Sequence, residues 1–341
     1  MRARSVRPGA RVWETLAATA VLVLAVTATR EARAFCRTTT CGLPANFAPT
    51  DSDCHPADYE AWCASQNPPA KILPVYWSNA CVSYDIQQDA SRQVPYATAA
   101  TLFATAFSKW TGTSCAGPPG SGRGDVSISV QDLGPVACNR VQYSSDQGNQ
   151  HVIIFHDDVW PHDDASNTLG LTTITFNPDT GEIYDADMEI NSTVPLTVAG
   201  PLPPTGNDFM SIITHESGHF LGMAHSNDNL ATMYAHYQPG TTYMRNLIAD
   251  DTTGICTIYP PAGVRTVDPN VADGGLLPED SCDPSPRHGF QSACNQPPAK
   301  GGGCAVEAPP VPSSSFLRGT ALLAAALVGA LFARRARKAR R

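Results

Sequence analysis

Apolar and polar residues alternate in several short segments between residues 75 and 190, and a helical spacing replaces this alternation at three places. A period of two is typical of strands, whereas apolar residues three and four positions apart are typical of amphipathic helices. The pattern predicts helices at residues 96–110, from about 208 to 221, and after residue 251. It predicts strands at residues 75–77, 82–86, 125–130, 151–155, 171–176 and 183–190, with a turn at residues 177–181.

Residues near the ends of the predicted helices support these boundaries. Pro95 stands at the first turn of the first helix, where its missing N–H costs nothing. Asn207 or Asp208 can cap the second helix with a side-chain oxygen. Gly222 can end that helix because glycine adopts a positive φ without strain.

The first 34 residues have the composition of a targeting segment. A basic start precedes an apolar run at residues 16–28, and Ala-Arg-Ala follows at residues 32–34. This order is typical of a secretory signal peptide with a cleavage site of small residues, so we expect the mature chain to begin near Phe35. An uncleaved anchor is the alternative.

Residues 316–341 combine an almost uninterrupted Ala/Leu/Val stretch with an Arg-rich end. The stretch is barely long enough to cross a membrane, and the basic end would stay in the cytoplasm. With Cys304 after three glycines, this tail resembles the C-terminal sorting signal of myxobacterial surface proteins. That resemblance implies attachment to the outer bacterial surface, and an ordinary single-span anchor is the alternative.

The charge of the chain is unevenly distributed. Leaving out residues 1–34 and 316–341, 10 basic side chains face 29 acidic ones, a net charge of −19. A surface this acidic repels phosphates and anionic lipids, which excludes nucleic-acid binding and confines membrane contact to the C-terminal helix. It is compatible with bound Ca²⁺.

The cysteines indicate an oxidising compartment. Setting Cys304 aside leaves ten, an even number in a chain with an export signal, which predicts about five disulfides of undetermined connectivity. Residues 35–70 are Cys-spaced and Pro-rich and have no core of their own, while residues 263–315 have the Pro/Gly/Asp composition of a linker. The domain between them, residues 71–262, is expected to be monomeric.

One motif carries the chemistry, and it runs from His215 to His225. His215 and His219 lie one helical turn apart, so both imidazoles can reach one metal ion, and a turn at Gly222 brings His225 to the same ion. Three nitrogen ligands leave one position of a tetrahedral Zn²⁺ site open for water, and Glu216 is placed to take a proton from that water. A zinc site that only stabilises the fold is the alternative, but it would need no acid beside its ligands.

The motif is that of the metzincins, and the residues after it resemble the matrixin branch, the matrix metalloproteinase type. Ser226, Met233 and Tyr237 follow at the matching spacings. The similarity extends over residues 71–259 and includes three further segments, residues 106–110, 124–128 and 250–259. It implies an α+β domain with a twisted, mixed, mostly parallel sheet packed with helices, an active-site helix ending at a glycine turn, a Met-turn and a C-terminal helix.

The resemblance also implies roles for single residues. Met233 would form the turn beneath the zinc and have a packing role, and Tyr237 would line the pocket for the substrate side chain after the cut bond. Ala235 stands where the family has a proline, so the sequence does not determine the structure of that pocket wall. Cys41-Gly-Leu-Pro is similar to the pro-segment whose thiolate caps the zinc, but it lacks the flanking Arg and Asp, so we expect a disulfide instead.

The sequence contains candidate ligands for two further metal sites. Asp185, Asp187 and Glu189 alternate on one face of a predicted strand and are either calcium ligands or a water-facing surface. The structural zinc of the family needs His/Asp/His/His. His156, Asp158 and His162 could supply part of this set, but the later ligand positions hold Thr172, Thr173, Ala186 and Asp187, so we expect this zinc to be absent.

Together these features predict a secreted or surface-attached zinc endopeptidase that cleaves extracellular polypeptides with Glu216 as general base and acid. The substrate would lie extended along residues 171–176. A catalytically silent, surface-attached peptide-binding protein on the same fold is the alternative. The sequence leaves open the natural substrate, the preferred side chains and whether the N-terminal segment inhibits.

Overall fold

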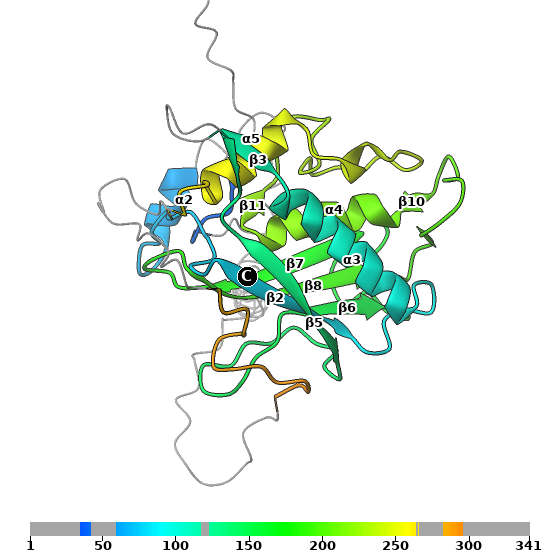
Figure 1. Cartoon of the computed structure of the whole chain (residues 1–341), viewed down its shortest axis with the longest axis horizontal. Coiled ribbons are helices and arrows are strands. Elements are labelled where there is room, and N and C mark those ends of the chain that lie inside the picture. Colours follow the sequence, from blue (N-terminus) through cyan, green and yellow to red (C-terminus); the bar gives the residue numbers. More distant parts are fainter. Residues whose placement is uncertain (1–34, 42–58, 117–122, 264, 266–281, 296–341) are drawn as a thin grey trace, which may run out of the picture. The chain divides into compact units, whose positions relative to one another are not determined.

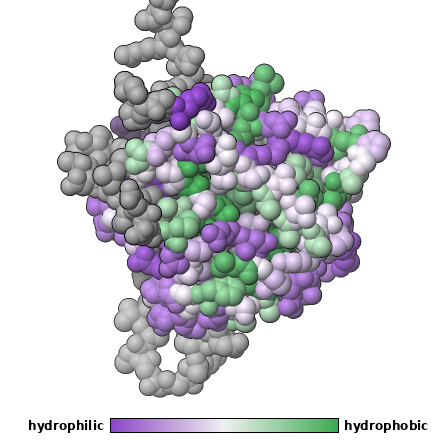
Figure 2. Space-filling model, viewed as in Figure 1, coloured by the Kyte–Doolittle hydropathy of each residue, from purple (hydrophilic) through white to green (hydrophobic). Residues whose placement is uncertain are grey.

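The computed structural model describes residues 35–41, 59–116, 123–263, 265 and 282–295. The predicted signal peptide and the C-terminal tail therefore lie outside the described residues. Within those residues, no helix combines the length and the apolar character that a membrane crossing requires. Hydrophilic and hydrophobic side chains are interspersed over the face drawn in Figure 2.

A five-stranded sheet in the order β5-β2-β6-β8-β7 forms the centre of the domain (Figure 1). Strands β2 (Cys81–Gln87), β5 (Ser129–Val136), β6 (Val152–His156) and β8 (Ile183–Asn191) are parallel to one another. Strand β7 (Gly170–Phe176) is antiparallel to β8 and lies at the edge. The predicted mixed, mostly parallel sheet is therefore confirmed.

Two predicted strands differ from the structure. Residues 75–77 form no strand, and Tyr76 makes only an isolated bridge to Glu182. Residues 125–130 are divided between β4 (Arg123–Asp125), which pairs with β3 (Ser114–Ala116), and the start of β5. Alternation of apolar residues shows neither whether a segment pairs nor which segment it pairs with, because pairing depends on other parts of the chain.

The helices α3 (Tyr96–Thr111) and α4 (Phe209–Phe220) lie in front of the sheet in Figure 1 and match the predicted helices closely. Their buried aromatic residues pack against the side chains of the sheet, with the rings of Tyr84 and Phe107 stacked 4.7 Å apart. Removing a large apolar side chain of this kind from water stabilises the fold by about 2 kcal/mol. The third predicted helix is α5 (Ala249–Ile258).

Short elements complete the domain. Helix α2 (Tyr59–Ser65) and strand β1 (Cys36–Arg37) come from the N-terminal segment. Strand β1 pairs with β11 (Met223–Ala224), which follows α4 directly. Strands β9 (Leu196–Thr197) and β10 (Asn207–Asp208) pair with each other, and a 3₁₀ helix, η1, covers Tyr243–Arg245.

Disulfides connect distant parts of the chain, as the cysteine count predicts. The described residues contain the pairs Cys41–Cys63, Cys81–Cys282, Cys115–Cys256 and Cys138–Cys294, and Cys36 is also disulfide-bonded. Two of these bonds fix residues 282–295, which belong to the predicted linker, to β2 and to the loop after β5. The Phe290 backbone also pairs with that of Asn149. The domain boundaries as a whole stay a prediction.

Candidate active site

Helix α4 begins at a capped end that is held by an ion pair. Asp208 accepts a hydrogen bond from the backbone N–H of Ser211 at 2.9 Å, and the guanidinium of Arg245 donates to both carboxylate oxygens, at 2.8 and 2.5 Å. Burial raises the pKa of the Asp208 carboxyl, but these bonds outweigh burial and hold it below its ordinary value. The cap is therefore ionised and fixes the start of the helix that carries the metal ligands.

The turn at Gly222 brings the third histidine to the other two. Gly222 has a φ of +89°, which lies in the left-handed region. A Cβ atom at this position would lie 3.0 Å from the carbonyl oxygen of Val75, so a side chain would also be crowded. Both constraints explain the glycine, and the predicted helix end is confirmed.

The three imidazoles converge on one point. Nε2 of His219 lies 3.0 Å from Nε2 of His215 and 3.2 Å from Nε2 of His225. Nδ1 of His215 lies 2.7 Å from the carbonyl oxygen of Thr232, and Nδ1 of His219 lies 2.9 Å from that of Met223. A carbonyl oxygen only accepts, so both Nδ1 atoms carry the proton and both Nε2 lone pairs point to the shared centre.

This arrangement fits Zn²⁺. Within the described part of the chain, these three histidines are the only group of three or more candidate ligands whose donor atoms all lie within 4.8 Å of one another. Burial lowers the pKa of all three imidazoles, and neighbouring imidazoles add to the effect at His215, whose pKa falls to about 3, and at His225. The rings are therefore neutral at pH 7, which is the state that binds zinc. The predicted ligand set is confirmed.

Glu216 lies beside the triad and is buried. The hydroxyl of Thr172 on β7 donates to its Oε2 at 2.7 Å. Burial raises the pKa of Glu216 to about 7, although the bond from Thr172 lowers it. A Cβ atom on Gly170 would lie 2.7 Å from Oε1 of Glu216, so only glycine leaves room for this carboxylate. Sequence reasoning did not find these roles of Thr172 and Gly170, because nothing in their spacing connects β7 to α4.

Met233 lies under the helix that carries the ligands. A Cβ atom on Gly218 would lie 2.3 Å from Sδ of Met233, so the two residues are in close contact. Both carboxylate oxygens of buried Asp251 fix the turn by accepting from the backbone N–H groups of Thr232, Met233 and Ile248 at 2.9, 3.1 and 2.9 Å. The position agrees with the predicted packing role of Met233, and that role stays a prediction.

The triad opens into a cleft of about 580 Å³. Edge strand β7 lines the cleft together with Ile212, Ala235 and Tyr237. The Tyr237 hydroxyl accepts from the backbone N–H of Asp208 at 2.9 Å and donates to the carbonyl of Thr241 at 2.9 Å, which holds the ring at the start of α4. Its assignment to the pocket after the cut bond stays a prediction.

A family model described as Matrixin matches residues 76–260, which is more than half of the chain. The chain belongs to the matrixin family. The match includes the sheet, the histidine triad, the Met233 turn and α5, so the predicted fold is confirmed and the domain is a zinc-peptidase domain of this family. Residues 35–75 and 282–295 lie outside the matched span.

Curated matrixin relatives share the same region. The chain is 34% identical over 139 residues to matrix metalloproteinase-16 of Homo sapiens, which is 38% of this chain and 22% of that protein. It is 38% identical over 104 residues to matrilysin of Homo sapiens, 30% of this chain and 36% of that protein. A probable matrix metalloproteinase of Invertebrate iridescent virus 3 is 28% identical over 137 residues. The alignments span well under half of each of these relatives.

The three alternating carboxylates project from the face of β8 that is turned away from α3 and α4, and all three are buried. They do not form a water-facing surface. Asp187 accepts from the backbone N–H groups of Gln142 and Val152, each at 2.8 Å. Asp185 lies 3.9 Å from Nε2 of His151. Burial raises the pKa of Asp187 to about 8 and that of Asp185 as well. A calcium site here stays a prediction.

The residues considered for a structural zinc have other partners. Both oxygens of Glu189 bind histidines, Oε1 to Nε2 of His156 at 2.7 Å and Oε2 to Nε2 of His162 at 2.8 Å. Asp158 pairs with Arg92 at 2.8 Å. The His156–Glu189–His162 group connects the loop before β7 to β8, and the expected absence of the second zinc stays a prediction.

Proposed function

We propose that the protein is an exported zinc-dependent endopeptidase that hydrolyses peptide bonds of extracellular polypeptides. One observation carries the proposal: three neutral imidazoles direct their Nε2 atoms to one point at the wall of an open cleft, with the buried carboxylate of Glu216 beside them. A zinc site that only stabilises a fold needs neither a cleft nor an adjacent acid.

The triad of His215, His219 and His225 would hold Zn²⁺. The bound ion would act as a Lewis acid toward a water molecule and toward the scissile carbonyl. Glu216 takes a proton from the attacking water and returns it to the departing amine nitrogen. The Thr172 hydroxyl orients this carboxylate through the 2.7 Å bond to Oε2, and it leaves Oε1 for the proton transfer.

Strand β7 provides a docking edge for the substrate backbone. It is the last strand of the sheet, it pairs only with β8 in the described residues, and all of its residues are partly exposed. An extended peptide can add to such an edge through main-chain hydrogen bonds, which demand little of its sequence. This geometry favours polypeptide substrates with varied sequences.

Export is supported by the disulfides, which persist in oxidising compartments. We propose in addition that residues 1–34 direct secretion and that residues 316–341 hold the protein at the bacterial surface, as their composition indicates. Both segments lie outside the described residues.

Metal removal tests the enzymatic function. The purified mature chain, incubated with a denatured protein, is expected to produce fragments that disappear when a zinc chelator is added and return when zinc is restored. Mass spectrometry of the digest measures this directly. Binding of the denatured protein without any cleavage, with zinc present at one equivalent, would instead favour a catalytically silent peptide-binding protein.

A further inference from the structure

We propose that the N-terminal segment, residues 35–41 together with α2, is a wall of the active-site cleft that contacts the substrate residues preceding the cut bond. This inference rests on the proposed endopeptidase function. The segment lies outside the span that matches the matrixin model, so the family match assigns it no role. The N-terminal segment would therefore give this chain its own preference for the substrate residues before the cut bond.

Thr38 and Thr39 line the same cleft as the histidine triad. The backbone N–H of Thr38 donates to the carbonyl of Gly222 at 3.0 Å, and its hydroxyl donates to the carbonyl of Met223 at 3.0 Å. The Met223 carbonyl also accepts from Nδ1 of His219. The N-terminal segment and a zinc ligand therefore bind the same carbonyl oxygen.

The two ends of α4 show which side of the zinc this wall occupies. Tyr237 is bound to Asp208 at the start of the helix, whereas Thr38 is bound to Gly222 just after its end. The helix has 12 residues, so its ends are roughly 18 Å apart. The family resemblance predicts that Tyr237 lines the pocket for the side chain after the cut bond, and on that prediction Thr38 and Thr39 lie on the side of the residues before it.

Contacts of the sheet agree with this placement. Thr39 forms a β-bridge with Pro74. Tyr76, two residues after Pro74, forms a β-bridge with Glu182. Glu182 directly precedes β8, whose first residue Ile183 is opposite Phe176, the last residue of β7. Glu216 contacts the other end of β7, at Gly170 and Thr172. Thr39 therefore lies toward the far end of the docking strand.

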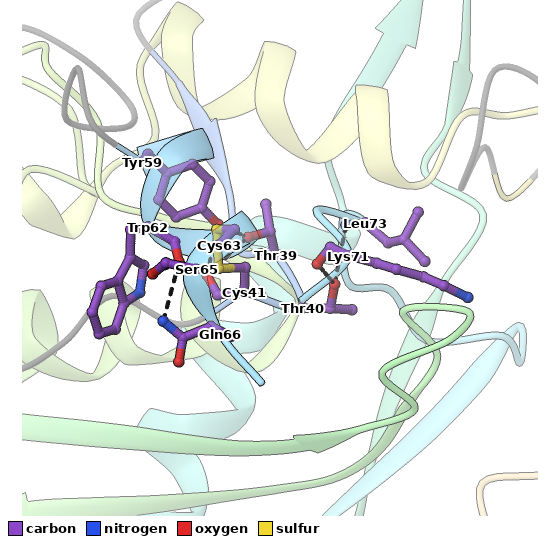
Figure 3. The surroundings of a disulfide bond; sticks show 10 residues. All are labelled: Thr39, Thr40, Cys41, Tyr59, Trp62, Cys63, Ser65, Gln66, Lys71 and Leu73. Atoms are coloured by element: carbon purple, nitrogen blue, oxygen red, sulfur yellow. Dashed lines mark hydrogen bonds between the residues drawn. A yellow bond between two sulfur atoms is a disulfide. The ribbon is translucent and has the colours of Figure 1, made fainter. Parts of the chain in front are cut away.

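The wall is held rigidly. The disulfide Cys41–Cys63 closes the segment onto α2, and the Tyr59 hydroxyl contacts that of Thr39 and donates to the carbonyl of Cys41 at 2.6 Å (Figure 3). Thr40 bonds to the backbones of Lys71 and Leu73 on the other side. Cys41 is thus paired with Cys63, as predicted, and in this state its sulfur is not free to cap the zinc.

Substitutions of Thr39 that change its size in opposite directions test the proposal. The probe is a mixture of synthetic twelve-residue peptides randomised at the central six positions, with cleavage sites mapped by mass spectrometry. Thr39→Phe is expected to reduce cleavage after large side chains about tenfold, and Thr39→Ala to increase it, with preferences after the cut bond unchanged. Thr101→Phe, at an exposed position of α3, is the matched control and is expected to change neither side.

A binding experiment separates this inference from the proposed function. The same peptides are selected on immobilised, zinc-loaded protein that carries Glu216→Ala, with Thr39 either unaltered or replaced. The inference holds if the Thr39 substitutions change which residues are preferred at one end of the retained peptides only. It holds even if the unaltered protein cleaves nothing. Unchanged preferences for both folded Thr39 variants, or a shift confined to residues after the cut bond, would overturn it. Absence of cleavage with the shift intact would overturn only the proposed function.

Discussion

Replacement of Glu216 by alanine is expected to lower kcat/KM for peptide cleavage by about a thousandfold while zinc stays bound. Among the described residues that line the cleft, Glu216 has the only carboxylate, and it is not one of the three histidine ligands. Cleavage of a fluorogenic peptide and the zinc content of the purified protein measure the two effects separately.

Two further variants complete this experiment. His219→Ala is expected to lose both zinc and activity, because it removes the central imidazole of the triad. Asp89→Ala, at an exposed position of the turn after β2, is the matched control and is expected to retain both. Substantial cleavage by zinc-loaded Glu216→Ala would show that another group moves the proton.

Replacement of Asp251 by alanine is expected to reduce the free energy of unfolding by about 4 kcal/mol. The substitution leaves three backbone N–H groups, those of Thr232, Met233 and Ile248, without their acceptor, and each unsatisfied buried donor costs roughly 1–3 kcal/mol. It also loosens the turn whose Thr232 carbonyl orients His215. Urea unfolding of the purified zinc-bound and zinc-free protein measures the change.

Thr252→Ala is the control for this measurement, because Thr252 is the next residue of α5 and its hydroxyl bonds only to the carbonyl of Ala249. It is expected to change stability by less than about 0.5 kcal/mol. A loss below about 1 kcal/mol for Asp251→Ala would mean that water replaces the carboxylate and that the turn does not depend on it.

Local features of the chain were predictable because their physical causes are local. The spacing of the two histidines on one helical turn, the cap at Asp208 and the positive φ at Gly222 each depend on a few neighbouring residues. The same holds for the continuous apolar run of β6 and for the alternation of apolar residues in β8. The zinc ligands could therefore be named from the sequence, and Glu216 could be predicted as the general base.

Contacts between distant segments were not predictable in this way. The alternating carboxylates of β8 were expected either at a calcium ion or in water, but the structure buries all three, because loops outside the strand cover this face. Residues 75–77 have the pattern of a strand but no strand partner beyond one bridge. In both cases the answer depends on what packs against the segment.

The sequence by itself therefore determined the family of this protein, the metal and its ligands, and it predicted the proton acceptor. Only the tertiary structure decided what surrounds that chemistry. It paired the cysteines, set Thr172 and Gly170 beside Glu216, and placed Thr38 and Thr39 in the cleft. A helix fixes the geometry of residues one turn apart, whereas contacts between residues far apart in the sequence are fixed by the order of the strands and by packing.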